Sequence, residues 1–441
     1  MRKQNSMAKD LILFSLPLIL SGVLQQLYNW ADAFIVGHSG AEGELLLAAV
    51  GVTGPITTLL LRCIIGFTTG LAILAGQEFG QGNTESVSRI KQIFQPLLTG
   101  FFLLGTVLVI VFAEPLLRFM DTPANILNYA RSYLQIVLAA MPFLLVYNLE
   151  TSLLRAIGNT KIAFYSVLLS SVLNVILDIL FVWVFSFGIA GAAVATAISQ
   201  VAMTIYVSVY TRTRYPELFS RSTERSKKLL RSGFSFGVPP TLQNSIASFG
   251  SLILQNFMNQ FGTTTVLAVT TAYRVDSLLL LPLFNMGSAI SSMVARFYGE
   301  GDRKQIRQCL ISGTWLIALI SAVLTLAMYF FGAAFIGFFG VTGEALDFGR
   351  VFFQDVCLFY VPFGIATALR CILEGIGDLS FCSVIGIASL VVRIACSYLL
   401  RPLIGNRTVA YAEMISWIFL LVMMIFRTWQ KRREIFPDKT A

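Results

Sequence analysis

The stretch SLPLILSGVLQQLYNWADAFIVG, residues 15–37, belongs to an apolar run that extends from Leu11 to Val36. A run of this length can cross a bilayer as a helix, which needs about 20 apolar residues. It nevertheless contains the carboxylate of Asp32, with Tyr28 one helical turn earlier on the same face. A charged side chain at membrane depth is costly and usually faces a polar partner or a water-filled path. The stretch therefore predicts a membrane helix that carries a polar site.

A second apolar run, from Tyr165 to Val184, repeats this pattern with Asn174 and Asp178, again four residues apart. One aspartate near a helix end could simply be wetted by solvent, but two carboxylates in separate spans predict a site. Burial and a neighbouring like charge favour the protonated form of a carboxyl group. Asp32 and Asp178 are therefore the candidate residues for coupling to an ion gradient, with Na⁺ binding at Asp32, Asp178 and Asn174 as the alternative.

The composition indicates an integral membrane protein, because 56% of the 441 residues are hydrophobic and 12% are charged. Soluble proteins carry roughly 25% charged residues. Apolar runs of this length are expected to be helical, since only intrahelical bonds satisfy their backbone groups in a bilayer. We predict an all-α, polytopic fold with twelve transmembrane helices, at about 11–37, 46–76, 92–113, 126–154, 162–186, 188–211, 234–260, 264–295, 308–339, 347–373, 380–403 and 408–428.

The net charge of +9 is concentrated in three segments, residues 1–10, 212–231 and 427–439. Lys and Arg accumulate in the cytoplasmic loops of membrane proteins. We therefore expect a multi-pass protein of the cell (inner) membrane with both termini in the cytoplasm. We expect no binding of nucleic acid, because no soluble domain accompanies the basic segments.

The two halves of the chain are repeats at an offset of 219 residues. The segment QEFGQGN (77–83) matches RFYGEGD (296–302), and IGN (157–159) matches IGD (376–378) at the same offset. Six spans per half make the halves parallel, related by a pseudo-two-fold axis along the membrane normal. The prediction is a six-helix lobe over 1–211, a basic cytoplasmic linker over 212–232 and a second six-helix lobe over 233–441.

Several other residues are candidates for special roles. Pro17 lies inside the first span, where it removes a helix hydrogen bond and predicts a hinge. Asp355 is the second-half acid that best fits a substrate contact. Arg274 and Asp276 are expected to pair or to contact lipid headgroups. Charged residues that lie nearer the span ends are expected to reach the interface, among them Glu150, Arg393 and Glu413.

The sequence contains no GxxxxGK[ST], HExxH or GxSxG motif. We therefore expect no enzyme activity and no cofactor beyond a coupling ion, H⁺ or Na⁺. Amide and hydroxyl oxygens favour Na⁺, whereas a hydrophobic surround favours protonation.

The chain resembles, over essentially its whole length, the multidrug and toxic compound extrusion (MATE) transporters. The resemblance is carried by the stretch with Tyr28, Asp32 and Gly37, and by the loops at 77–83 and 158–160 with their second-half partners. The resemblance implies a cation-coupled exporter with twelve helices in two lobes. One branch of that family has a polar cation site in the first lobe and a proline that bends the first helix, here Pro17. The residues of this chain that match that site are Tyr28, Asp32, Tyr133, Asn148, Asn174, Asp178 and Thr196. Other members use a second-lobe acid in the seventh helix, where this chain has only Asn244, Gln255 and Asn256.

We therefore expect a secondary active antiporter that exports amphipathic or cationic organic compounds, as a monomer in the lipid bilayer, by alternating access. The alternative from the same broad superfamily is a flippase for lipid-linked saccharides. A flippase should have a strongly cationic cavity, whereas the deep charges identified here are acidic.

Overall fold

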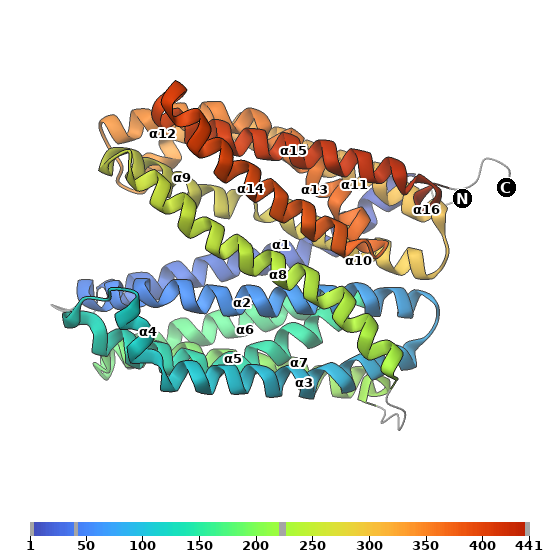
Figure 1. The fold of residues 1–441 in the computed structure, drawn as a ribbon. Coiled ribbons are helices and arrows are strands. Elements are labelled where there is room, and N and C mark those ends of the chain that lie inside the picture. Colours follow the sequence, from blue (N-terminus) through green and yellow to red (C-terminus); the bar gives the residue numbers. More distant parts are fainter. Residues whose placement is uncertain (1–3, 39–42, 220–225, 437–441) are drawn as a thin grey trace. The chain divides into compact units, whose positions relative to one another are not determined.

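A computed structural model describes residues 4–38, 43–219 and 226–436 of the chain (Figure 1). The chain divides into two compact units, which we call the N-terminal unit (Leu20–Thr241) and the C-terminal unit (Met1–Ile19 with Leu242–Ala441). Helices form throughout because the apolar runs are long and are interrupted mainly by short Gly-, Asn- and Asp-containing loops.

The N-terminal unit is built around helix α5 (Ala124–Ala156), which packs against α2, α3 and α7. Several apolar side chains of α5 are fully buried, including Leu134, Leu138 and Leu149. The helices of this unit are α1 (Gln4–Gly37, from Leu20 onward), α2 (Gly43–Gly80), α3 (Thr84–Val111), α4 (Ala113–Phe119), α5, α6 (Lys161–Asp178), η1 (Ile179–Val184), α7 (Gly188–Arg214), η2 (Pro216–Phe219) and the first part of α8 (Lys227–Asn259).

The C-terminal unit has a corresponding central helix, α13 (Tyr360–Gly375), which contacts α10, α11 and α15. Its apolar side chains form two clusters, one around Ile290 and Leu373 and the other around Phe353 and Tyr360. Its other helices are the second part of α8, α9 (Thr263–Leu279), α10 (Leu281–Gly299), α11 (Arg303–Phe338), α12 (Glu344–Val356), η3 (Cys357–Phe359), α14 (Leu379–Ile404), η4 (Gly405–Arg407), α15 (Thr408–Gln430) and α16 (Arg432–Ile435).

The all-α, polytopic fold class is confirmed, with helices at each of the twelve predicted spans. The part of the chain that the structure describes contains nine segments long and apolar enough to cross a membrane, and ten if α9 and α10, which meet at a 43° bend, count as one span. One of these segments, Leu379–Gln430, contains both α14 and α15. The remaining predicted span is α8, whose centre carries the polar residues Thr241, Gln243 and Asn244.

The repeated loops have the same local geometry in both halves. Asn83 caps α3 by accepting a hydrogen bond from the Ser86 N–H at 3.2 Å, and Asp302 caps α11 by accepting one from the Gln305 N–H at 3.0 Å. The preceding glycines, Gly82 and Gly301, have φ values of 79° and 71°. A positive φ favours glycine at both places, which explains why the loop sequence is retained in each half.

Three further loops follow the same offset. Gly158 and Gly377 have φ values of 101° and 97°, and each follows the helix at the centre of its unit. Positive φ also occurs at Asp121 and Ser186, and the residues 219 positions later, Gly340 and Gly405, again have positive φ. The duplication is therefore preserved in the backbone even where the residue type has changed.

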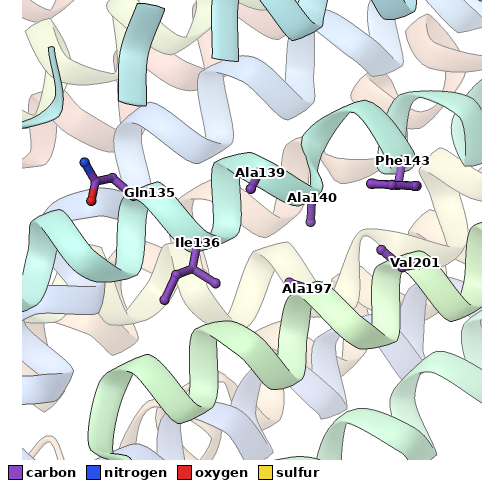
Figure 2. Close-up of a pocket in the computed structure, with 7 residues that line it drawn as sticks. All are labelled: Gln135, Ile136, Ala139, Ala140, Phe143, Ala197 and Val201. Atoms are coloured by element: carbon purple, nitrogen blue, oxygen red, sulfur yellow. The ribbon is translucent and has the colours of Figure 1, made fainter. Parts of the chain in front are cut away.

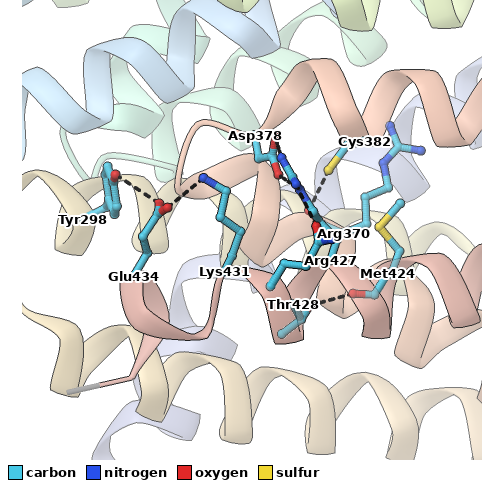
Figure 3. A network of polar contacts seen from close by, with 10 residues as sticks. Tyr298, Arg370, Asp378, Cys382, Met424, Arg427, Thr428, Lys431 and Glu434 are labelled. Carbon is cyan, nitrogen blue, oxygen red and sulfur yellow. Dashed lines mark hydrogen bonds and ion pairs between the residues drawn. The ribbon is translucent and has the colours of Figure 1, made fainter. Parts of the chain in front are cut away.

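The second repeated loop is tied down differently in the two units. In the N-terminal unit, Asn159 donates hydrogen bonds to the hydroxyls of Tyr210 and Tyr215 at 3.0 and 3.2 Å. In the C-terminal unit, the matching Asp378 forms an ion pair with Arg427 of α15, with an Nε–Oδ2 distance of 2.6 Å (Figure 3). The contacts of Asn159 and Asp378 thus each hold the repeated loop against the last long helix of its half, α7 or α15. Near the second of these contacts, Glu434 of α16 pairs with Lys431 at 2.7 Å.

Helices α1 and α8 each change unit part-way along. The boundary falls after Ile19 in α1, just beyond Pro17, and after Thr241 in α8, just beyond Pro239 and Pro240. Met7 and Leu11 of α1 consequently belong to the core of the C-terminal unit. The lobe boundaries at 1–211, 212–232 and 233–441 stay a prediction, and residues 220–225 of that linker lie outside the described residues.

Candidate functional site

Two carboxyl groups meet inside the N-terminal unit. Asp32 lies on α1, and Asp178 is the last residue of α6. The two groups are within hydrogen-bonding reach of each other. Asp178 is 0% exposed, and no described group donates a hydrogen bond to either of its oxygens or to Oδ1 of Asp32. Because an ionised carboxylate only accepts hydrogen bonds, the two groups cannot hydrogen-bond each other while both are ionised.

The helices that carry the pair are held together close to it. Directly after Asp178 the chain forms the π-helical turn η1, a distortion often found at functional sites. From this turn Trp183 donates its indole N–H to the backbone oxygen of Ile35, at 3.2 Å, three residues beyond Asp32. The end of α1 is thereby fixed against the end of α6.

Asn174 adds a third oxygen-bearing group one turn before Asp178. It is 1% exposed, and no described group forms a hydrogen bond with either polar atom of its amide. Burying such groups without a partner is unfavourable. The orphaned oxygens of these groups therefore fit a bound cation at Asp32, Asp178 and Asn174, although the described residues contain no group of three or more His, Cys, Asp or Glu that could hold a metal.

A polar cavity of about 350 Å³ lies beside the pair, within the N-terminal unit. Tyr28 and Tyr133 line it, and the charges of Asp32 and Asp178 act on both phenol groups. Helices α1, α2, α5, α6 and α7 supply its walls. Its polar lining consists of Gln25, Tyr28, Asn29, Thr57, Thr58, Tyr133, Tyr147, Asn148, Ser170, Ser171 and Gln200.

The structure brings most of the predicted site residues into one region. Asn148 lines the cavity and donates its side-chain N–H to the Leu144 backbone oxygen at 2.8 Å. Thr196 lies half-buried on α7 and is not among the lining residues. The roles of all seven residues stay a prediction.

Sequence reasoning missed several lining residues. Gln25 lies three residues before Tyr28, and Asn29 three before Asp32, so helical spacing alone could have identified both. Thr57 and Gln200 lie on α2 and α7. For these two, the signal was only a polar residue in an apolar run.

A second hollow of the N-terminal unit lies between α5 and α7 and has a volume of about 360 Å³ (Figure 2). Its lining is apolar apart from Gln135, which points away from α7 in this view. None of the described residues lining it titrates.

Asp355, the candidate substrate contact, lies near the end of α12. Its carboxylate forms an ion pair with Arg407, with a shortest distance of 2.7 Å, and accepts three hydrogen bonds from that guanidinium. Its role in substrate binding stays a prediction.

Two expectations for intramembrane charges are wrong. Glu150 does not reach the interface: it is 1% exposed, pairs with Lys91 at 2.8 Å and accepts a hydrogen bond from Ser208 at 2.9 Å. Glu413 is also buried and pairs with Arg393 at 2.9 Å. Both acids lie on buried faces of their helices, where a charge needs a partner inside the protein.

Arg274 and Asp276 do not pair either. Residues two apart on a helix face different directions, and Arg274 is exposed whereas Asp276 is buried. Asp276 accepts a hydrogen bond from the hydroxyl of Tyr360 instead.

The chain was then compared with known proteins. A model of the MatE family matches residues 17–180 and 239–399, well over half of the chain. The chain belongs to the MATE family of transporters.

Two relatives from Bacillus subtilis (strain 168) are similar to this MATE chain over most of their length. "Probable multidrug resistance protein YoeA" is 31% identical over 398 residues, which span 88% of this chain and 85% of the relative. "Probable multidrug resistance protein YpnP" is 28% identical over 419 residues, which span 94% and 93%. A solved MOP superfamily transporter from Pyrococcus furiosus is 20% identical, and the likeness covers 97% of this chain and 96% of that chain with a TM-score of 0.88, so the two chains share a fold.

Proposed function

We propose that this MATE chain is a multidrug efflux antiporter, which exports amphipathic or cationic organic compounds in exchange for H⁺ or Na⁺. One observation carries the ion coupling: the half-buried Asp32 and the fully buried Asp178 lie together, and no described group forms a hydrogen bond with Oδ1 of Asp32 or with either carboxyl oxygen of Asp178. Such a pair gains stability when a proton or cation binds. The names of the two Bacillus subtilis relatives support multidrug export.

The neighbouring cavity supports an organic substrate of mixed polarity. Tyrosine rings and apolar side chains offer contact area, and Tyr faces can attract an organic cation. Among the described lining residues there is no Lys or Arg. A flippase for lipid-linked pyrophosphate sugars would need such cationic groups, so the cavity favours export of organic compounds.

Coupling requires that the ion and the substrate favour different conformations of the protein. Cation binding at Asp32 and Asp178 would favour one position of α1 relative to α6. Pro17 lacks the N–H needed for a helix hydrogen bond, so α1 can bend near the unit boundary. In the proposal, this bend narrows the cavity and expels the substrate.

The test is uptake of a fluorescent cationic dye into inverted membrane vesicles, with a pH gradient and a Na⁺ gradient imposed separately. Uptake driven by the pH gradient without Na⁺, and abolished by a protonophore, would identify H⁺ as the coupling ion. Strict dependence on the Na⁺ gradient would identify Na⁺. Uptake that responds to neither gradient, with protein present at normal amount, would contradict antiport.

A further inference from the structure

The C-terminal unit contains its own buried polar group, which the proposed antiport mechanism does not use. We call it the Asp276 cluster. Its members are Tyr273 and Asp276 of α9, Tyr360 of α13, Arg393 of α14 and Glu413 of α15. Asp276 and Glu413 are each 7% exposed.

Hydrogen bonds connect the cluster in two parts. Arg393 pairs with Glu413 at 2.9 Å and donates to the Tyr273 hydroxyl at 2.7 Å, and that hydroxyl donates to Glu413 at 3.3 Å. Separately, the Tyr360 hydroxyl donates to Oδ1 of Asp276. The charges of Arg393 and Glu413 also act on Asp276, so the two parts form one electrostatic unit.

The charges of the cluster do not balance. Two carboxyl groups face one guanidinium, and the other ionisable groups that the structure describes around Asp276 are the neutral hydroxyls of Tyr273 and Tyr360 and the thiol of Cys357. The surroundings are apolar and belong to the buried cluster of Phe353, Val356 and Trp417. Arg393 is already committed to Glu413, so the fully ionised cluster would leave one negative charge buried without compensation, which is strongly unfavourable.

The internal repeat places this cluster on helices that correspond to walls of the cavity in the N-terminal unit, since α9, α13, α14 and α15 match α2, α5, α6 and α7. Asp276 lies 219 residues after Thr57, which lines the cavity of the N-terminal unit. Arg393 lies 219 residues after Asn174. Two of the five cluster positions therefore have a polar counterpart in the first half, whereas Tyr273, Tyr360 and Glu413 correspond to Gly54, Met141 and Val194.

We propose that the Asp276 cluster is a second proton-binding site, with one proton on Asp276 that neutralises the excess charge. A hard metal cation would require several free oxygen ligands. Here Tyr360 and Arg393 direct their hydrogen atoms towards the two acids instead. This proton is additional to any ion bound at Asp32 and Asp178.

Infrared spectroscopy of the purified, full-length protein tests the proposal, because a protonated carboxyl group has a carbonyl band well separated from that of a carboxylate. The background variant is Asp32→Asn with Asp178→Asn, which removes the first site, so the result does not depend on the proposed antiport. At neutral pH this background should still show a protonated carboxyl band, and Asp276→Asn should remove it.

The charge balance makes two sharper predictions. Glu413→Gln should also remove the band, because Arg393 is then available to balance an ionised Asp276. Arg393→Gln should add a second band, because both acids then need a proton. Gel filtration and circular dichroism check the fold of each variant, and Glu413→Gln serves as the test if Asp276→Asn fails to fold.

A band that survives both Asp276→Asn and Glu413→Gln would overturn the proposal. So would a band that disappears when Na⁺ is added to the background variant, since the ligand would then be a metal ion. An unchanged spectrum in a folded Arg393→Gln protein would show that the cluster does not share one charge balance.

Discussion

At the scale of single residues, Asp178 shows how local backbone geometry and burial act together. It ends α6, where the π-helical turn begins, and its side chain is fully buried. A carboxylate in that position is stable only if something positive accompanies it. Asp32, which approaches it from α1, cannot supply that charge, and in the proposed mechanism a coupling ion supplies it.

Asp32→Asn and Asp178→Asn should each abolish uphill efflux while the protein still reaches the membrane. Asn keeps the size of Asp and some hydrogen bonding, but it cannot exchange a proton or neutralise a cation. Removing an intramembrane charge relieves roughly 2.5–3.5 kcal/mol on insertion scales, so protein yield should not fall. The measurement is gradient-driven dye transport, normalised to membrane abundance. Asp347→Asn, at an exposed position of α12, is the matched control.

Normal uphill transport in both variants would place the coupling residues elsewhere in the molecule. A purely structural role would instead lower the yield, with activity in proportion to the amount of protein.

Asp302→Ala should lower stability by about 1 kcal/mol, because it removes the cap of α11. Burial opposes the charge of Asp302, but hydrogen bonds from Gln305 and Lys304 outweigh it, and the pKa of this carboxyl lies below its usual value. A lowered folded-state pKa contributes stability above the unfolded-state pKa, and this contribution is lost as pH falls through the folded value.

The difference in thermal midpoint between wild type and Asp302→Ala should therefore be largest at neutral pH and should decrease as the pH is lowered. Asp302→Asn, which copies Asn83 of the first half, retains the acceptor oxygen and should keep most of the stability. If the difference in thermal midpoint between wild type and Asp302→Ala does not change with pH, the charge of Asp302 does not contribute to the cap, which would contradict this prediction.

At the scale of elements, the loops preserve the duplication better than the helices do. Ser186 and Gly405 both have positive φ, at 55° and 60°, although only glycine adopts it without strain. The first half therefore contains strain that the second half has avoided.

Ser186→Gly should raise stability by about 0.5–1 kcal/mol. Gly405→Ser should lower it by about 1–3 kcal/mol, because the φ of 60° and ψ of −133° at Gly405 lie in a region that is unfavourable for residues other than glycine. Ser251→Gly, at an exposed position inside α8, should lower stability, because glycine is unfavourable in a helix. The thermal midpoints of the three purified variants provide the comparison. Equal effects of the two Ser→Gly changes would show that backbone strain at Ser186 is negligible.

Much of the fold could be predicted because local sequence patterns determine where the helices and the repeated loops lie. Apolar runs located the helices, and the loop QEFGQGN with its partner located the repeat. Spacing along one helix likewise placed Tyr28 beside Asp32. Contacts between helices could not be predicted. The helical period of the apolar residues shows which face of a helix is buried, but it does not show which helix packs against that face. Asp276 and Tyr360 are 84 residues apart, and only packing brings them together.

At the scale of the whole molecule, the basic segments predict which ends of the helices face the cytoplasm. A cysteine at Lys228, within the basic stretch 212–231, should react with an impermeant maleimide only from the cytoplasmic side. A cysteine at Thr342, exposed before α12, should react only from outside. Glu42, where external labelling is also expected, lies outside the described residues.

The labelling is best done with Cys63 and Cys396 replaced by serine, since the other four native cysteines are buried. Labelling of both new cysteines from the opposite sides would reverse the predicted orientation of the protein. Labelling of both from one side would contradict the number of spans between them.

The exchange of helix segments between the units has a consequence for synthesis on the ribosome. Met7 and Leu11 are made long before Leu420 and Met424, with which they share a core. The start of α1 therefore enters the bilayer without these two neighbours, which are added only when α15 is translated. Leu229 of α8, by contrast, joins a core whose other members have already been made. The core around Leu229 can thus form before α15 is made, whereas the core that contains Met7 and Leu11 is completed only after α15 has been translated.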